Sequence, residues 1–204
     1  MIKIRNAKKN DLDEIVMLED RIWAEGIRAD KRKFESRLKI FPEGFFLAFN
    51  NDKLIGFSTS EIINYDSNPL SWEDITDNGY IKNHNKNGNT LYVVSIGAIS
   101  RSGGGSALIN AQKDLVKKLN LRNLVLGSRI PGYDEYSKKK GEINIKDYAT
   151  SIRENGELLD PELRFYTRNG LTLLEIVPNY MEDDKESRNY GAIMILKYLE
   201  VYHE

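Results

Sequence analysis

Residues 100–106 read Ser-Arg-Ser-Gly-Gly-Gly-Ser, and they follow the nearly continuous apolar run Leu91–Ile99. Such a run is typical of a central strand that is covered on both faces. The segment after it, Gly105–Leu119, has apolar residues at helical spacing and is predicted to be a helix. Its core-facing residues are Leu108, Ala111, Leu115 and Leu119. The sequence therefore predicts a strand, a glycine turn and a helix at this point.

The three consecutive glycines leave several amide protons uncovered by side chains. Glycine also tolerates positive φ, so successive N–H groups can converge on one anion. The dipole of a helix that begins near Gly105 favours negative charge at the same place, and Arg101 adds a full positive charge. These features together suit a pyrophosphate.

Composition excludes several other classes of protein. The chain has 204 residues, 40% apolar and 30% charged, with a net charge of −1, so the basic excess of a nucleic-acid-binding protein is missing. There is no cysteine, and His84 and His203 are the only imidazoles, so we expect no metal centre. The residues after Met1 lack the apolar segment of a signal peptide, and no apolar run approaches the roughly 20 residues of a membrane helix. We expect a cytoplasmic single-domain protein without a membrane partner. The sequence leaves open whether the protein forms a homodimer.

Apolar periodicity predicts an α/β protein whose mixed sheet is mostly antiparallel at its N-terminal side. The predicted order is strand, two helices, three strands, helix, strand, helix and two strands. The predicted strands are residues 2–5, 45–49, 54–62, 91–99, 123–127, 171–177 and 190–198, and the predicted helices are 11–24, 31–40, 105–119 and 160–169. Asn10 is the predicted N-cap of the first helix, and Asn50-Asn51-Asp52 is a predicted hairpin turn. Residues 64–89 and 128–157 are predicted to be long irregular insertions that wall a binding site, with Ile145–Ile152 as a candidate short helix within the second.

Three known types of glycine loop compete for residues 100–106. A Walker loop requires Gly-Lys followed by Ser or Thr, and here Gly105 is followed by Ser106-Ala107. A Rossmann loop belongs to the first strand–helix unit of a parallel sheet, whereas this loop follows several antiparallel strands. The third type is the coenzyme A loop of the GNAT superfamily, Gln/Arg-x-x-Gly-x-Gly/Ala, which Arg101–Ser106 resembles with Ser106 in the last place. A second register overlays Gly103–Leu108 on Gly-x-Gly-x-Ala-Leu, so the register of the phosphate-binding amides stays open.

The resemblance to the GNAT superfamily extends along the chain. Tyr166–Leu171 resembles the family's Tyr-x-x-x-Gly-Phe, with Leu171 in place of Phe. Residues 121–190 further resemble the acetyltransferase domain that is often fused to a carbon–nitrogen hydrolase, on Leu124–Tyr133, Gly156–Phe165, Val177–Tyr180 and Asp184–Tyr190. This resemblance implies the GNAT fold, with about seven strands and helices on both faces, in one domain over residues 1–204. No hydrolase half is expected, since the chain stops at Glu204.

The resemblance also implies a chemistry, namely direct transfer of an acetyl group from acetyl-CoA to a primary amine of a small molecule or peptide. It assigns coenzyme binding to Ile96, Ala98 and Ile99 at the end of the strand and to Arg101, Ser102, Gly103, Gly104, Gly105 and Ser106 in the loop. Backbone groups around Ile96 and Ala98 would pair with the pantetheine arm. Tyr166 is the implied proton donor to the leaving thiol.

Residues on the acceptor side are harder to assign. Arg129 and Tyr133 follow a strand, and Arg129 is a candidate for binding a substrate carboxylate through two hydrogen bonds. Glu61, Asp134 and Glu135 are considered as general bases, but each is expected to be a solvated surface residue, so no base is assigned. His84 is expected to be exposed and without a role. Because no carboxylate lies in the 91–99 strand, a catalytically weak acyl-CoA-binding regulatory module is the alternative to an enzyme.

Overall fold

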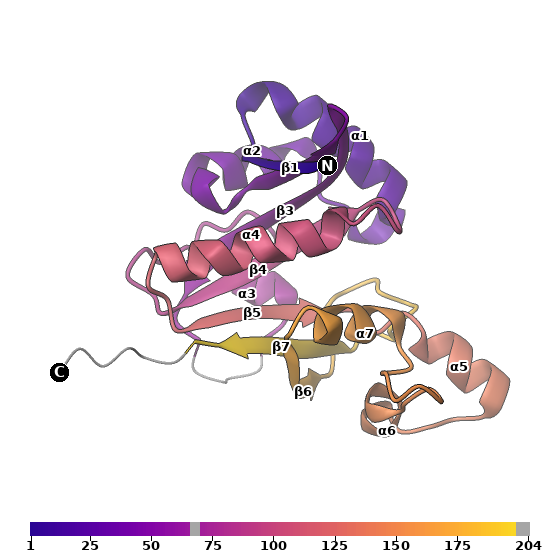
Figure 1. Cartoon of the computed structure of the whole chain (residues 1–204). Coiled ribbons are helices and arrows are strands. Elements are labelled where there is room, and N and C mark those ends of the chain that lie inside the picture. The colour runs from indigo at the N-terminus through magenta and orange to yellow at the C-terminus, as the bar shows by residue number, and fades with distance from the viewer. Residues whose placement is uncertain (66–69, 199–204) are drawn as a thin grey trace. The chain divides into compact units, whose positions relative to one another are not determined.

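The protein is described here by a computed structural model of residues 1–65 and 70–198. Its seven strands form a mixed sheet in the order β1-β2-β3-β4-β5-β7-β6, with helices on both faces (Figure 1). The predicted α/β class, the mixed sheet of about seven strands and the order of the predicted elements are confirmed. Residues 66–69, which belong to the predicted 64–89 insertion, lie outside the described residues.

The strands are β1 (Ile2–Asn6), β2 (Phe46–Asn50), β3 (Lys53–Ile63), β4 (Thr90–Ala98), β5 (Asn123–Ser128), β6 (Thr172–Val177) and β7 (Gly191–Lys197). The helices are α1 (Leu12–Ile22), α2 (Lys31–Ile40), α3 (Trp72–Thr76), α4 (Gly104–Lys118), α5 (Tyr133–Lys140), α6 (Ile145–Thr150) and α7 (Pro161–Arg168). Short 3-10 turns lie at Lys9–Asp11, Glu25–Ile27 and Pro42–Gly44. The chain divides into two compact units, one of Met1–Asn68, Glu73–Leu124 and Lys197–Glu204, the other of Pro69–Trp72 and Val125–Leu196.

In the first unit, helices cover both faces of strands β1 to β4. Neighbouring residues of β2 point to opposite faces, as the period of two in a strand requires. Leu47 packs with Ile15 of α1 and Phe34 of α2, whereas Ala48 packs with Leu108 of α4. The antiparallel pairs β1–β2, β2–β3 and β3–β4 confirm the antiparallel N-terminal side of the sheet.

Of two local predictions from the sequence, the hairpin turn is confirmed and the helix N-cap is wrong. Asn51 and Asp52 have φ of 48° and 59°, the left-handed pair that a two-residue hairpin favours, so the predicted turn is confirmed. The predicted N-cap at Asn10 is wrong, because a 3-10 turn over Lys9–Asp11 precedes α1. The Asp11 carboxylate accepts a hydrogen bond from the Lys8 amide at 2.7 Å and closes that turn.

The second unit is built around one tyrosine. Tyr180 is only 1% exposed, and its ring lies over Gly127 of β5 and Gly191 of β7. A Cβ added at either glycine would overlap atoms of this ring. Glycine is therefore required at both positions, because any side chain there would overlap the phenol ring of Tyr180.

The segment 128–157 contains α5, where irregular chain was predicted, and α6, which lies at the candidate short helix over Ile145–Ile152. Helix α6 begins at an Asn144 side chain that accepts a hydrogen bond from the Lys146 amide at 2.9 Å. Helix α5 carries Tyr133, Tyr136 and three lysines with few apolar residues, so periodicity gives little signal for it. Contacts of its tyrosines with Tyr148 stabilise it in the folded chain.

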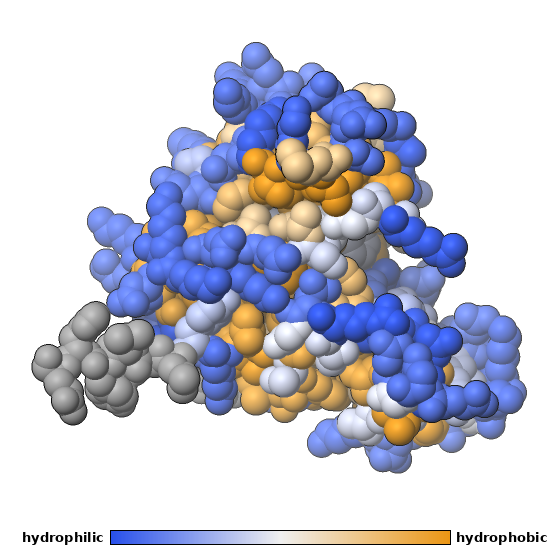
Figure 2. All heavy atoms as spheres, viewed as in Figure 1, coloured by the Kyte–Doolittle hydropathy of each residue, from blue (hydrophilic) through white to orange (hydrophobic). Residues whose placement is uncertain are grey.

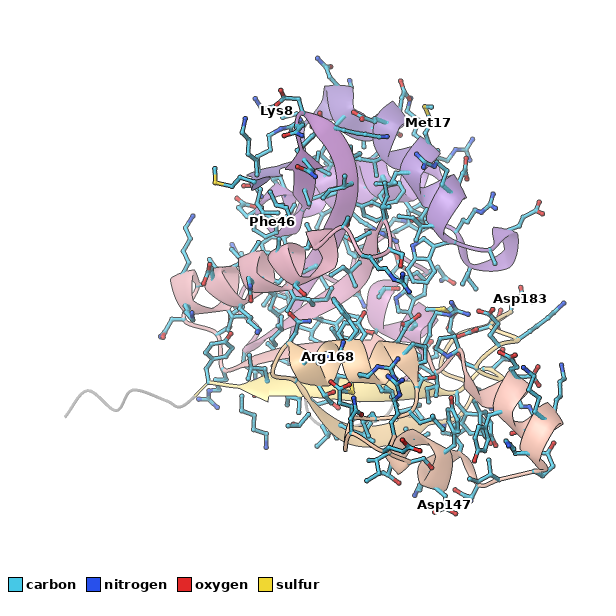
Figure 3. All side chains as sticks on the ribbon, turned by 45° about the vertical axis from the view of Figure 1, so that its right-hand side comes forward. Lys8, Met17, Phe46, Asp147, Arg168 and Asp183 are labelled. Atoms are coloured by element: carbon cyan, nitrogen blue, oxygen red, sulfur yellow. The ribbon has the colours of Figure 1, made fainter. Side chains whose placement is uncertain are left out.

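An apolar groove of about 420 Å³ lies in the first unit between α4 and strands β1 and β2. Its apolar lining is Ile4, Phe46, Ala107, Ala111 and Leu115. Figure 2 shows the outward side of α4 as hydrophilic and the strip between α4 and β1 as apolar, and Phe46 is labelled beside α4 in Figure 3. The lining includes no residue of the glycine loop.

The core between α2 and β3–β4 contains an unusual cluster of charged groups. Arg37 of α2 and Glu61 of β3 are 1% and 0% exposed. Arg37 donates to the Gly79 carbonyl at 2.8 Å and to the hydroxyls of Thr59 and Ser95 at 3.3 and 3.2 Å. Its Nη2 atom and both carboxylate oxygens of Glu61 have no hydrogen-bond partner among the described residues. Burial lowers the pKa of Arg37 to about 10 and raises that of Glu61 to about 8.

We predict that Gly127→Ala destabilises the protein by about 3 kcal/mol, because the new methyl group overlaps a ring that cannot move within a packed interior. Urea unfolding measures this loss. The double variant Gly127→Ala/Tyr180→Leu should be less destabilised than the sum of its two single changes. Strict additivity would show that the glycine and the ring do not oppose each other.

Glu61 should make stability depend on pH. Its pKa is raised to about 8 in the folded chain from 4.5, so between these values the folded state holds a proton that the unfolded state has lost. Stability therefore falls as pH rises from 4.5 to 8, by up to about 1.4 kcal/mol per pH unit, and levels off above 8. Glu61→Gln should remove the contribution of Glu61 and so make the slope shallower in denaturant unfolding between pH 5 and 8.5.

The matched control is Glu35→Gln at an exposed position of α2, which should keep the slope of the unchanged protein. Glu19 and Glu162 also have raised pKa values, to about 7 and about 8, but both are present in all three proteins and cancel in the comparison. Equal slopes in Glu61→Gln and the unchanged protein would contradict the prediction.

Candidate functional site

The glycine loop joins β4 to α4 through backbone in the left-handed region. Arg101 and Gly103 have φ of 58° and 78°, and α4 begins at Gly104, one residue before the predicted start. The Ser102 amide donates to the Ile99 carbonyl at 3.2 Å, and the Ser102 hydroxyl accepts from the Gly104 amide at 3.2 Å. Glycine adopts φ of this sign without strain, which explains Gly103.

In the first turn of α4, the N–H groups of Gly105 and Ser106 donate to no described residue. The helical bonding pattern starts with the Ala107 amide, which donates to the Gly103 carbonyl at 3.2 Å. Gly105 and Ser106 precede it in the first turn, where amides have no partner within a helix. A first turn with open amides and the positive end of the helix dipole binds anions such as phosphates.

Arg101 and Ser106 both border this turn. Arg101 is exposed and forms no ion pair with the residues that the structure describes, so its guanidinium is available to an anion. Ser106 is half-buried. At Gly104, by contrast, an added Cβ would lie 3.2 Å from the Ile55 Cδ1 atom, so this glycine also serves the packing of α4 on the sheet.

The register of β4 on β3 shows which backbone groups face outward. Ala98 is opposite Gly56 and Ile96 is opposite Ser58, and the Ile99 amide donates to the Ile55 carbonyl at 2.8 Å. In an antiparallel ladder, hydrogen-bonded positions alternate with positions whose N–H and C=O point the other way. The backbone groups of Ile96 and Ala98 therefore point away from β3. This is the orientation that pairing with an extended ligand would require.

Two residues that were expected to be exposed are buried or half-buried. Glu61 belongs to the buried cluster with Arg37, so the prediction that it is a solvated surface residue is wrong. The surrounding strand gives no sequence signal for this, since residues 58–61 read Ser-Thr-Ser-Glu within an otherwise apolar strand. His84 is half-buried, stacks on Phe41, and its Nδ1 atom accepts from the Ile62 amide at 3.0 Å. Burial lowers the pKa of His84, so the neutral ring is favoured.

In the second unit, α7 carries Tyr166. The Asp160 carboxylate caps this helix by accepting from the amides of Glu162 and Leu163 at 3.0 and 3.2 Å. Tyr166 is 6% exposed, and burial, with the nearby Glu162 and Tyr180, raises its pKa well above 10. Its phenol is therefore protonated at neutral pH, which is the state that a proton donor requires.

Arg129 already has carboxylate partners within the second unit. Its Nε and Nη2 atoms donate to the two Asp184 oxygens at 2.9 and 2.6 Å, and Nη2 also donates to Glu186 at 2.6 Å. Nη1 lies 4.0 Å from an oxygen of Glu162. This network provides a structural reason for Arg129, while its predicted contact with a substrate carboxylate stays a prediction.

Tyr133, the other predicted acceptor residue, is 6% exposed, and its hydroxyl donates to the Ile143 carbonyl at 2.9 Å. Its neighbours Asp134 and Glu135 face lysines and Arg188 on α5 and in the loop before β7. Hydrogen bonds from Lys138 and Arg188 lower the pKa of Asp134, and one from Lys139 lowers that of Glu135. Both carboxylates are thus weak bases. A role of Tyr133 toward an acceptor also stays a prediction.

None of the described helices has the length and apolar character needed to cross a membrane. Within residues 1–65 and 70–198, no three His, Cys, Asp or Glu side chains are grouped in a way that could hold a metal ion.

Two proteins of Bacillus subtilis (strain 168) resemble the chain in sequence. The N-acetyltransferase YkwB, itself uncharacterised, is 36% identical over 208 residues, which cover 95% of this chain and 87% of YkwB. The probable hydrolase YhcX is 36% identical over 197 residues, which cover 94% of this chain and 37% of YhcX. The chain therefore spans little more than a third of that longer relative. No protein-family model matches the sequence.

Two solved structures share the fold. The loading GNATL domain of CurA from Lyngbya majuscula has a TM-score of 0.85 at 21% identity, over 97% of this chain and 98% of that domain. The GphF GNAT-like decarboxylase, in complex with isobutyryl-CoA, has a TM-score of 0.83 at 21% identity, over 96% and 98% of the two chains. Likeness at this identity shows the fold alone. The match to nearly the whole of YkwB, together with this fold, shows that the chain belongs to the GNAT family of N-acetyltransferases.

Proposed function

We propose that this chain transfers an acetyl group from acetyl-CoA to a primary amine of a small-molecule or peptide acceptor, by direct attack of the amine in a ternary complex. The observation that carries the proposal is the turn from β4 to α4, where the open amides of Gly105 and Ser106 and the exposed Arg101 fit a pyrophosphate. The proposal includes one acetyltransferase domain over residues 1–204 and a cytoplasmic location.

The names of the relatives support this activity and this donor. YkwB is named as an N-acetyltransferase, and GphF was solved with an acyl-CoA. In the proposal, backbone groups of Ile96 and Ala98 pair with the pantetheine arm, since they point away from β3. Backbone N–H groups near the thioester carbonyl stabilise the charge that develops on its oxygen. Tyr166 protonates the thiolate as it leaves, and burial keeps its phenol protonated until then.

Ser106→Glu should weaken acetyl-CoA binding at least tenfold, because it places a carboxylate where the phosphates would bind. A glutamate in the first turn of a helix does not destabilise the helix, so folding should be retained. Titration calorimetry with acetyl-CoA measures the change, and the neutral isostere Ser106→Gln is the matched control, with affinity near that of the unchanged protein. Equal affinities of the Glu and Gln variants would show that the phosphates bind elsewhere.

Tyr166→Phe should lower kcat by about 10²-fold with acetyl-CoA affinity unchanged, since only proton donation is lost. Release of the free thiol is followed over a panel of primary amines, with acetyl-CoA and isobutyryl-CoA as donors. A rate equal to that of the unchanged protein would exclude Tyr166 as the proton donor. If acetyl-CoA binds but no amine releases thiol, the chain is an acyl-CoA-binding module without catalysis.

A further inference from the structure

We propose that Glu162 is the general base, which accepts the proton of the acceptor amine and then restores the proton that Tyr166 gives up. This inference rests on the acyl transfer proposed above. It concerns residues of the second unit, and it supplies the base that the sequence left unassigned.

Helix α7 places the two side chains on one face. Glu162 and Tyr166 are four residues apart, which corresponds to about 6 Å along the helix axis and to neighbouring positions on the same side. Leu163, between them in sequence, is fully buried and anchors the helix in the unit. The Glu162 side chain keeps 29% of its surface exposed, so part of this side chain is open to a substrate. Tyr166, at 6%, is almost enclosed.

The charges around Glu162 hold it near the point of ionisation. Arg129 is the nearest cation, but its strong hydrogen bonds go to Asp184 and Glu186, and it reaches Glu162 only at 4.0 Å. Asp160, Asp184 and Glu186 oppose ionisation of Glu162, and Tyr166 faces it along the helix. Burial and these acids outweigh Arg129 and raise the pKa of Glu162 to about 8. A carboxyl group with such a pKa is a much better base than an ordinary one.

The other carboxylates that could serve as bases are less suited. Glu61 is fully enclosed in the core of the first unit and cannot touch a substrate. Asp134 and Glu135 bind lysines, and their pKa values are lowered. Glu162 alone among these four combines a raised pKa with a partly exposed side chain.

The proton cycle closes between the two residues. The amine nitrogen forms a bond to the acetyl carbon, its proton passes to the Glu162 carboxylate, and the carbon–sulfur bond breaks. The sulfur atom takes the phenol proton of Tyr166. Glu162 is now protonated and Tyr166 is ionised, so transfer of the proton from the carboxyl group to the phenolate returns both to their starting state. The products are the N-acetyl amine and free coenzyme A, with no other reactant.

The test is Glu162→Gln in the full chain. We expect kcat to fall by about 10²-fold or more with acetyl-CoA affinity unchanged. In the unchanged protein, kcat/KM should rise with pH through a limb whose midpoint is near 8, and the variant should lose this limb. Ionisation of the amine itself is common to both proteins and cancels in the comparison. The control is Glu157→Gln, which removes a partly exposed carboxylate bound to Arg168 at the end of α7 (labelled in Figure 3) and should retain the rate and the pH limb.

A second measurement does not need turnover. In protein labelled with ¹³C at the glutamate side chains, the Glu162 signal is the one that Glu162→Gln lacks, and it should titrate well above 4.5. A midpoint at or below 4.5, or a Glu162→Gln variant that keeps the pH limb, would overturn the role of Glu162. Failure of the unchanged protein to bind acetyl-CoA would instead overturn the proposed function, and the role of Glu162 with it.

Discussion

The packing of α4 against the sheet determines where its N-terminus points, and the candidate coenzyme site depends on this contact. Leu108 of α4 is fully buried against Ala48 and Ile55. Close approach is possible because a Cβ at Gly56 would lie only 3.0 Å from the Leu108 Cδ1 atom. The packing fixes the position of α4, and the left-handed turn at Arg101 and Gly103 connects the end of β4 to the start of this helix. The open amides of the first turn are then held in place by the core.

The first unit also buries two ionisable side chains, Arg37 and Glu61. An enclosed carboxylate without a hydrogen bond costs several kcal/mol unless it holds a proton. The raised pKa of Glu61 indicates that its carboxyl group is protonated and neutral near pH 7. Arg37 is close enough to interact with it but does not form an ion pair. Arg37 also binds the Gly79 carbonyl, so the chain before β4 is attached to α2 through this buried side chain. The cluster therefore joins the helical layer, the sheet and a long connecting segment.

The acidic side chains of the second unit differ in what their carboxylates bind. Asp184 is 1% exposed and Glu186 is at the surface, yet both use their charge to hold Arg129. Asp160 caps α7 and also accepts from the Gly132 amide at 3.0 Å, which ties the start of this helix to the chain before α5. Of these four acids, only the Glu162 carboxylate accepts no short hydrogen bond from a described residue, and Arg129 reaches it only at 4.0 Å. This structural network thus leaves one acid, Glu162, on the same helix face as a protonated tyrosine.

By itself, the sequence determined the class of fold, the order of the predicted strands and helices and the family, because apolar periodicity, glycine turns and motif spacing are local properties. The loop at residues 100–106 and the turn at Asn51-Asp52 were recognisable for that reason. Helix α5 was not recognisable, since tertiary contacts of its tyrosines, and not an apolar stripe, support it. Only the tertiary structure decided that Glu61 is buried, that Arg129 is already bound by acids and that Glu162 has a raised pKa. Burial and pKa depend on which distant segments surround a side chain, and no local pattern encodes that.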